Sequence, residues 1–125
     1  MKVFNYKDLK GTERDVDCPN GGFNSIRMLL AEDKMGFTMT RTLVYKGKAQ
    51  HWHYKNHLEA CYCIKGQGVL TDLKTKKKYK IKSGVLYVLD KHDNHTFQAK
   101  KNTLLLCIFN PPLFGREVHK ADGSY

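Results

Sequence analysis

Short segments rich in β-branched and aromatic residues recur along the chain, and helical periodicity is weak almost everywhere. Turn-forming residues separate these segments, for example at 66–68 (GQG) and 82–84 (KSG). This pattern predicts an all-β sandwich or barrel. The strands that we expect cover residues 26–30, 36–44, 60–65, 68–72, 78–81, 85–89, 95–99 and 103–110.

The two ends of the chain lack this alternation. Residues 11–22 show no clear pattern, and we expect an arm or a short helix there that leads into the barrel. Pro111 and Pro112 cannot lie in a central strand, because proline lacks the N–H group that a β-ladder needs. We therefore expect one domain over residues 1–125, with an N-terminal arm at 1–22 and a closing segment at 111–125 that wraps the barrel or forms a lid.

The formal net charge of +10 comes largely from lysines around one expected hairpin turn. A basic patch can bind nucleic acid, but lysines without arginine at a single loop are more typical of a solvated face. We therefore expect no nucleic-acid partner. We also expect no membrane span, since no stretch approaches roughly 20 apolar residues. The lysines are Lys74, Lys76, Lys77, Lys78, Lys80 and Lys82.

Four cysteines are present, Cys18, Cys61, Cys63 and Cys107, and none forms a Cys-x-x-Cys pair. The N-terminus has scattered charge and lacks the apolar core of a signal peptide. Together these features favour reduced core thiols in a cytoplasmic protein over a disulfide framework.

The richest stretch for chemistry is HWHYKNHLEACYCIKGQG, which runs from His51 to Gly68. His51, His53, His57 and Glu59 fall within nine residues of one another. Imidazole and carboxylate groups at such spacing are candidate ligands for a divalent metal ion. A direct interpretation takes His51, His53 and Glu59 as the ligands.

A barrel of short strands with a Glu-x6-Gly step, here Glu59 and Gly66, resembles the cupin superfamily. The resemblance implies a cupin β-barrel, a jelly-roll-like double sheet, with one or two short helical turns. Counted back from Glu59, the two positions that histidines usually occupy in that motif hold Trp52 and Tyr54 in this chain. His51 and His53 lie one residue out of register and would face the opposite side of the sheet, unless a bulge near residues 55–56 brings them back.

Longer strings resemble the ectoine synthase family, a divergent branch of the cupins, from about Gly11 to the last residue. They are GTERDVDCPNGGF, MGFTMTRTLVYKG, HYKNHLEACYCIKGQG, LYVLDKHDNH and FNPPLFGREVHKADG. The resemblance implies that Glu59, Tyr87 and His95 hold the metal. Tyr87 follows Gly84 by three residues, where the cupin pattern has a ligand histidine. The family is taken to use iron(II), and zinc would accept the same ligands.

The family activity is a hydro-lyase reaction that cyclises N4-acetyl-L-2,4-diaminobutyrate to the compatible solute L-ectoine, the last step of an osmoprotective pathway. Carried onto this chain, the resemblance implies two groups of residues around this small-molecule substrate. Substrate-binding candidates are Arg27, Thr40, Thr42, Asp93, Cys107 and Phe109. Catalytic candidates are Glu117, His119, Tyr54 and His57, with Glu117 and His119 as an acid/base pair.

Several alternatives stay open from the residues alone. Tyr87 and Phe109 are also typical core residues, and Arg27 could be a surface charge. Phe23, Thr40 and His53 depart from tryptophan, asparagine and tryptophan in many family members. A non-catalytic cupin that binds a small molecule is one alternative function, and a dioxygenase-type cupin with His51, His53, Glu59 and His95 is another. We expect a homodimer, for which the N-terminal arm could supply a swapped strand.

Overall fold

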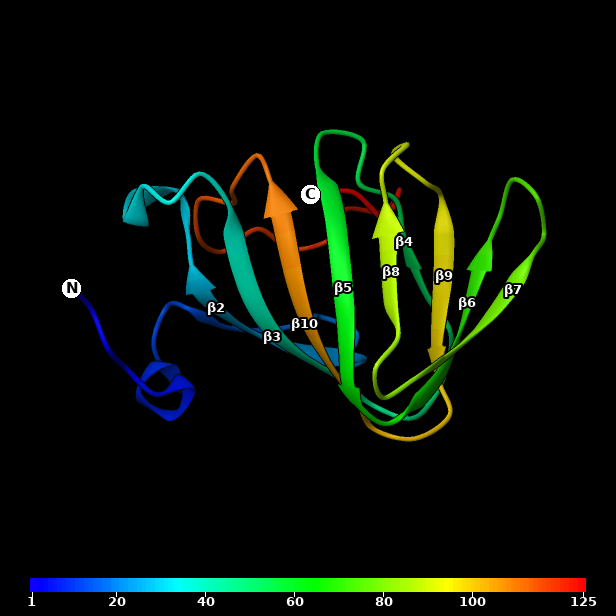
Figure 1. The fold of residues 1–125 in the computed structure, drawn as a ribbon, viewed down its shortest axis with the longest axis horizontal. Helices are drawn as coiled ribbons and strands as arrows, with labels where there is room; N and C mark the ends of the chain where they lie inside the picture. The colour runs from blue at the N-terminus through cyan, green and yellow to red at the C-terminus, as the bar shows by residue number, and fades with distance from the viewer.

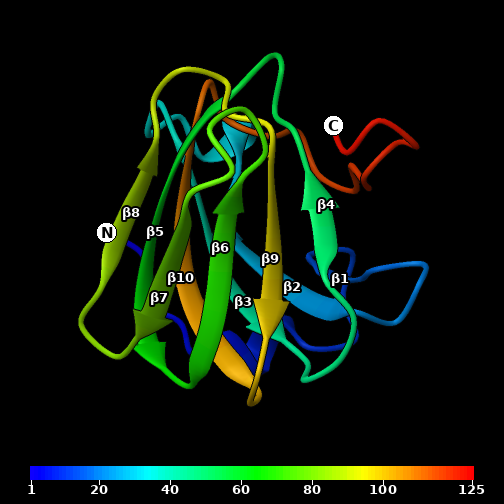
Figure 2. The same cartoon turned by 90° about the vertical axis from the view of Figure 1, so that its right-hand side faces the viewer.

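The computed structural model describes residues 1–125 and contains two antiparallel β-sheets that face each other around the core (Figures 1 and 2). The larger sheet has the order β1 (Asp15–Asp17), β2 (Phe23–Leu29), β3 (Thr38–Val44), β10 (Thr103–Asn110), β5 (Leu58–Lys65) and β8 (Leu86–Leu89). The smaller sheet has the order β4 (Gln50–Trp52), β9 (His95–Ala99), β6 (Gln67–Asp72) and β7 (Lys78–Lys82). Two 3-10 turns, η1 (Tyr6–Leu9) and η2 (Ala31–Asp33), complete the fold. The predicted all-β double sheet with short helical turns is confirmed.

Two strands were missed by the sequence pattern. β1 lies within residues 11–22, where we expected an arm or a short helix, and it pairs with β2 as part of the larger sheet. β4 lies in the stretch around His51 and pairs with β9. Each has only three residues, which is too short to show an alternation. The other strands begin and end within three residues of the expected bounds.

Alternating side chains fill the space between the sheets. β3 places Thr38, Thr40, Thr42 and Val44 inward, and β5 and β10 contribute buried residues at every second position. One end of the barrel is closed by apolar side chains, namely Cys63, Ile81, Phe97, Ala99 and Leu105. The polar side chains that bear on function lie toward the other end, where β5 begins and β10 ends.

The backbone explains why position 66, the glycine of the Glu-x6-Gly step, is a glycine. Its φ is +107°, a conformation that residues with a side chain rarely adopt. A Cβ there would also lie 2.5 Å from the Thr103 Cα. The sharp connection between β5 and β6 therefore requires glycine, and it sets the register of the strand that carries Glu59.

The closing segment, residues 111–125, crosses the polar end of the barrel. The Leu113 N–H donates to Thr38 Oγ1 at 2.7 Å, and the Leu113 carbonyl accepts from Ala31 N–H. Farther along, the Gly123 carbonyl accepts from His53 N–H at 2.8 Å. The segment is thus hydrogen-bonded to β3 of the larger sheet at one point and to His53, the residue after β4, at another. In Figures 1 and 2 it runs near the upper end of the barrel.

All four cysteines are buried, free thiols, as the sequence predicted. No helix of the structure is long and apolar enough to cross a membrane. The lysine-rich residues lie on and around the β6–β7 hairpin, where only Ile81 of β7 is buried.

Candidate active site

Six buried side-chain atoms lack a hydrogen-bond partner, and three of them belong to a carboxylate, a phenol and an imidazole on strands inside the barrel. These three atoms are Glu59 Oε2, Tyr87 Oη and His95 Nε2, and their strands, β5, β8 and β9, belong to both sheets. An unpaired buried polar group costs about 1–3 kcal/mol. Three such groups in one barrel indicate a site that a ligand completes. Carboxylate, phenol and imidazole are together a donor set that fits a divalent metal ion.

Glu59 and Tyr87 lie on neighbouring strands of the larger sheet. Tyr87 stands opposite Cys61, two residues beyond Glu59 on the same face of β5. Burial raises the pKa of Glu59 to about 7, although the nearby Cys61 and Cys107 thiols partly oppose this rise. Burial also raises the pKa of Tyr87 well above its usual range. A nearby cation would favour the charged form of both groups.

His95 faces them from the smaller sheet with a fixed tautomer. Its Nδ1 lies 2.8 Å from the Asp93 carbonyl oxygen, which can only accept, so Nδ1 carries the hydrogen. Burial lowers the pKa of His95 and keeps the ring neutral. The Nε2 lone pair is therefore free, an arrangement typical of metal-binding histidines. Asp93, expected to bind substrate, instead orients His95 through its backbone, and its carboxylate accepts from Lys91 N–H.

A small chamber lies next to these three groups. Thr40 and Thr42 face it with their hydroxyl oxygens 2.9 Å apart. Cys107 and Phe109 line its wall from β10. The structure therefore brings together most of the residues expected around the substrate. The chamber is lined by Phe23, Ser25, Thr40, Thr42, Trp52, Tyr54, Glu59, Tyr87, Leu105, Cys107, Phe109, His119 and Tyr125.

Arg27 is almost fully buried, with 1% of its side chain exposed, so it is not a surface charge. Its Nη1 donates to the Gly115 carbonyl at 2.5 Å, and its Nη2 donates to the Glu117 carbonyl. The Glu117 carboxylate lies 3.7 Å from Nη1, and Nε has no partner. Both Nη groups of this substrate-binding candidate thus bond the closing segment, which leaves Nε as the free donor.

His119 is paired with Tyr54 instead of with Glu117. Its Nε2 lies 2.6 Å from the Tyr54 hydroxyl oxygen, while Nδ1 has no partner. Burial, together with the charge of Arg27, lowers the pKa of His119 to about 3, and burial raises that of Tyr54 well above its usual range. Tyr54 is therefore a phenol that donates to Nε2, and Nδ1 carries the free N–H.

Glu117 is bound to its own loop. Its carboxylate accepts from Phe114 N–H at 2.7 Å and from Gly115 N–H at 2.6 Å. Burial alone would raise the pKa of Glu117, but these backbone bonds and the charge of Arg27 outweigh it and lower the pKa. The expected Glu117–His119 acid/base pair therefore does not form in this conformation, because each side chain is satisfied by another group.

Tyr125 fills most of the chamber. Its ring stacks on His119 at 4.5 Å and on Tyr54 at 5.1 Å between centroids, and the Arg27 guanidinium lies 5.4 Å from its centre. A cavity of about 10 Å³ remains, which is room for one water molecule at most. A molecule the size of an acylated amino acid therefore fits in the chamber only if Tyr125 moves.

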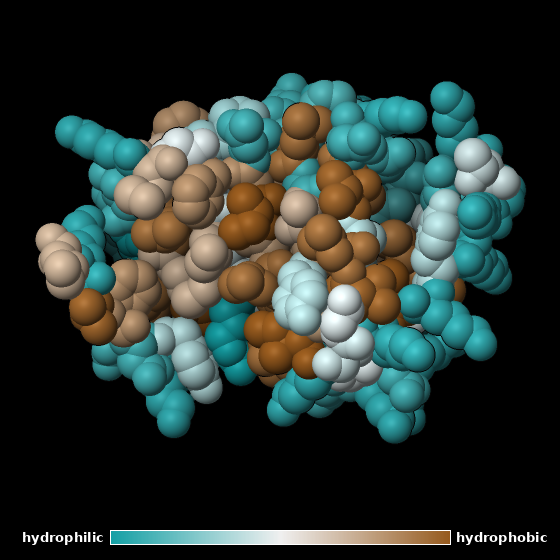
Figure 3. Space-filling view, in the orientation of Figure 1, coloured by the Kyte–Doolittle hydropathy of each residue, from teal (hydrophilic) through white to brown (hydrophobic).

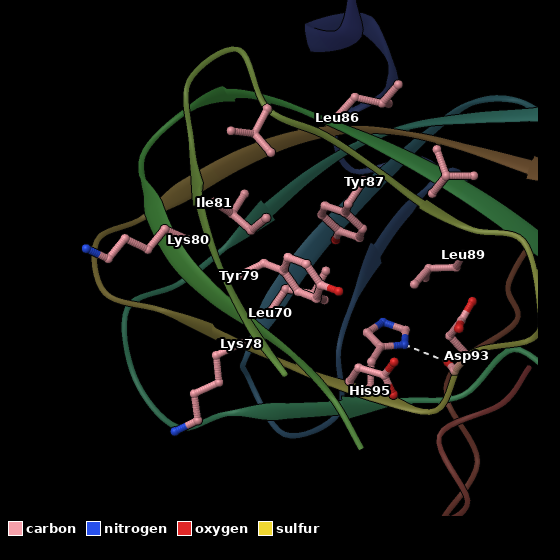
Figure 4. Close-up of a pocket in the computed structure, with 13 residues that line it drawn as sticks. Leu70, Lys78, Tyr79, Lys80, Ile81, Leu86, Tyr87, Leu89, Asp93 and His95 are labelled. Carbon is pink, nitrogen blue, oxygen red and sulfur yellow. Dashed lines mark hydrogen bonds between the residues drawn. The ribbon is translucent and has the colours of Figure 1, made fainter. Parts of the chain in front are cut away.

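A larger groove reaches the same site from the side, between the edge strands β7 and β8. It has a volume of about 570 Å³, and Tyr87, His95 and Asp93 are among its lining residues (Figure 4). Lys78 and Lys80 lie at its rim, with side chains that point away from its centre in Figure 4. Tyr87 and His95 thus line the groove, Glu59 and Tyr87 line the chamber, and Tyr87 lies between the two.

The interpretation of His51 and His53 as ligands is wrong. The side chain of His51 is exposed and its Nε2 lies 2.6 Å from Asn94 Oδ1 on the outside of β4, while Trp52 faces the core. No bulge restores the register in β4, which pairs evenly with β9. The dioxygenase-type set of His51, His53, Glu59 and His95 is therefore not assembled.

The remaining candidate, His57, lies at the rim of the site. Its ring is 6.4 Å from that of Phe109 and 6.2 Å from that of Tyr125, its Nδ1 is unpartnered, and burial lowers its pKa. Tyr125 itself was missed, because an aromatic residue in a segment without periodicity carries no signal. Cys61 was seen only as a core thiol, although its strand position two residues from Glu59 places it in the site.

Comparisons with known proteins agree with this arrangement. The family model for ectoine synthase matches residues 1–125. The L-ectoine synthase of Marinomonas sp. is 52% identical over 118 residues, which cover 94% of this chain and 92% of that protein. The L-ectoine synthase of Teredinibacter turnerae is 46% identical over 125 residues, which cover 100% of this chain and 95% of that protein.

Solved structures give the same result at the level of the fold. The crystal structure of ectoine synthase from P. lautus has a TM-score of 0.86 and 38% identity, covering 91% of this chain and 80% of that one. A predicted oxalate decarboxylase from Thermotoga maritima has a TM-score of 0.70 at 17% identity, covering 88% and 99%, and shares the fold alone. The expected cupin barrel is thereby confirmed.

Proposed function

The chain belongs to the ectoine synthase family, and we propose that it closes N4-acetyl-L-2,4-diaminobutyrate into the ring of L-ectoine with loss of water. It is an enzyme of the lyase class, a hydro-lyase. The alternatives of a binding-only or dioxygenase-type cupin gain no support, since the second needs His51 inside the barrel and its side chain lies outside.

One observation carries the proposal for the metal centre: the unpartnered buried atoms Glu59 Oε2, Tyr87 Oη and His95 Nε2. We assign these three residues as the ligands of iron(II), and zinc is the second candidate because it accepts the same donors. A divalent ion held there would act as a Lewis acid on the acetamide oxygen and make the carbonyl carbon, a poor electrophile in an amide, open to attack.

The chain's own groups account for binding and orientation. Ring closure requires the α-amine and the acetamide carbonyl carbon to meet, so the flexible substrate must be held curled. Arg27 Nε offers a buried cationic donor for the substrate carboxylate. Thr40 and Thr42, which now bond each other, offer hydroxyl groups to the polar ends, and Phe109 supplies an apolar wall.

Proton transfer falls to His119 and Tyr54. The attacking amine loses a proton and the leaving oxygen gains one, so the reaction needs a group that can shuttle a proton without net gain. His119 is neutral. Its Nδ1–H has no partner, and its Nε2 accepts a hydrogen bond from the Tyr54 hydroxyl group. We assign Nδ1–H as the donor to the leaving oxygen. The Tyr54 O–H replaces that proton at Nε2, and the Tyr54 oxygen takes up the proton that the attacking amine loses. Glu117 then holds the loop and balances the charge of Arg27.

The test is conversion of N4-acetyl-L-2,4-diaminobutyrate to ectoine, followed by NMR with iron(II)-loaded protein. Tyr87→Phe removes only the unpartnered hydroxyl and should reduce turnover at least 100-fold. Tyr62→Phe, on the exposed outer face of β5, is the matched control and should leave turnover unchanged. Equal turnover in both variants would remove Tyr87 from the site. Tight binding without any turnover in the unmodified protein would favour the binding-only cupin.

Three further properties belong to the same proposal. We propose a homodimer, supported by the exposed apolar residues Leu86 and Val88 on the edge strand β8 and by exposed Val3 and Phe4 in the arm that could pair with it. Apolar side chains gather over the face shown in Figure 3. Free thiols support a reducing compartment such as the cytoplasm. The role of the product there would be osmoprotection as a compatible solute.

A further inference from the structure

Two thiols lie beside Glu59, the carboxylate of the candidate metal centre. Cys61 follows Glu59 by two residues on the inner face of β5, and Cys107 stands directly opposite Cys61 on β10. The two Sγ atoms are 3.4 Å apart. A carboxylate oxygen of Glu59 and both sulfur atoms all lie within 4.8 Å of one another, and all three residues are buried.

The distance between the two sulfur atoms distinguishes a pair that binds a metal ion from a pair that forms a disulfide. Two thiolates at about 2.3 Å from a zinc ion in tetrahedral geometry lie about 3.8 Å apart. A disulfide would bring them to about 2.05 Å. The observed 3.4 Å thus lies much closer to the chelating separation. The Glu59 oxygen supplies a third donor from the same strand, and its Oε2 atom is unpartnered.

We propose that Glu59, Cys61 and Cys107 form a second ligand set, which binds a strongly thiophilic divalent cation such as Cd²⁺ in competition with the set of Glu59, Tyr87 and His95. Binding converts two thiols to thiolates and releases two protons to solvent. Three protein donors leave a fourth tetrahedral position for water. The inference rests on the proposed function only in that both sets share Glu59.

Sharing one carboxylate makes the two sets mutually exclusive. An ion held by the thiolates takes Glu59 away from Tyr87 and His95, and it also ties up Cys107, which lines the substrate chamber. Thiophilic ions should therefore inhibit the enzyme and borderline ions such as iron(II) should activate it. The selectivity follows from sulfur as a soft donor and from phenolate and imidazole as harder ones.

The experiment titrates metal-free protein with Cd²⁺ and records the ultraviolet thiolate-to-cadmium charge-transfer band. The unmodified chain should show the band with saturation at one Cd²⁺ per chain. Cys61→Val and Cys107→Ser should each reduce its intensity by about half or more. Cys63→Val is the matched control, since Cys63 is also buried on β5 but bonds the Lys65 carbonyl, and it should keep the full band. Absence of the band in the unmodified chain, or equal loss with Cys63→Val, would overturn the inference.

A second measurement avoids reliance on variants that could fail to fold. X-ray absorption of the unmodified, cadmium-loaded chain should show two sulfur neighbours in the first coordination shell, and only nitrogen and oxygen neighbours would contradict the proposal. Cd²⁺ should inhibit iron-dependent cyclisation at least tenfold more strongly in the unmodified chain than in Cys61→Val. If cyclisation fails but the thiolate band appears, the proposed function fails alone. If cyclisation proceeds without the band, the second ligand set fails alone.

Discussion

The buried carboxyl group of Glu59 should make the metal-free protein less stable as the pH rises. Burial raises its pKa from an ordinary 4.5 to about 7, so between these values the folded chain holds a proton that the unfolded chain has lost. At about 1.4 kcal/mol per pKa unit, the free energy of unfolding should fall by about 3 kcal/mol across that interval. Above pH 7 this contribution should level off.

Glu59→Gln tests this because it keeps the shape of the side chain and removes its ionisation. We expect the variant to gain about 3 kcal/mol relative to the unmodified chain between pH 4.5 and pH 8, measured by urea unfolding with a chelator present. Added iron(II) should reverse the order, since only the chain with an ionisable Glu59 is stabilised by a bound cation. The same difference in unfolding free energy at both pH values would refute the reasoning.

Glu117→Gln serves as a control of opposite sign. Burial acts to raise the pKa of Glu117, but backbone N–H groups and Arg27 lower it overall. Its stabilising contribution is therefore present above the unfolded pKa and disappears as the pH falls through the folded pKa. Glu117→Gln should lose stability relative to the unmodified chain at pH 8 and lose less at low pH. A parallel response of the two variants would point to a general effect of pH.

Three further changes test other parts of the structure. Tyr87→Phe should weaken iron(II) binding at least tenfold by calorimetry, and an unchanged affinity would exclude the phenol as a ligand. Tyr125→Ala should lower the free energy of unfolding by about 2 kcal/mol, because a partly buried ring that packs against the core is lost. It should also raise the substrate association rate in stopped flow, whereas an unchanged rate would show that the ring does not block entry. Gly66→Ala should destabilise the chain by about 2 kcal/mol or more in thermal melts. Its φ of +107° is strained for alanine, and Thr103 lies too close for a methyl group. A neutral result would show that this turn can relax.

The predictability of the fold from the sequence depends on element length. Strands of four or more residues show an alternation or an apolar run, and these were found close to their observed bounds. β1 and β4 have three residues each and could not be distinguished from loops. Their places are set by pairing with β2 and β9, which is information from distant segments.

In the candidate site, too, the features set by local strand alternation were predictable and those set by distant segments were not. Strand alternation placed Trp52 inside the barrel and His51 outside it, and the structure confirms both. The partners of Arg27, Glu117 and His119 could not be predicted, because they depend on how the closing segment folds back across the barrel. Hydrogen-bond partners in such a segment are set by tertiary contacts rather than by local spacing.

The closing segment links the structure of the site to its access. Arg27 holds the segment by its Gly115 and Glu117 carbonyls, while Tyr125 occupies the space beside His119. Under the proposed function, a substrate carboxylate that binds the free Nε and the adjoining Nη as a fork would compete for one of those donors, and the substrate body would displace the Tyr125 ring. Substrate binding would thus loosen the segment. Entry and binding would then be coupled through one buried charge, and an uncharged analogue without the carboxylate should leave the chamber closed.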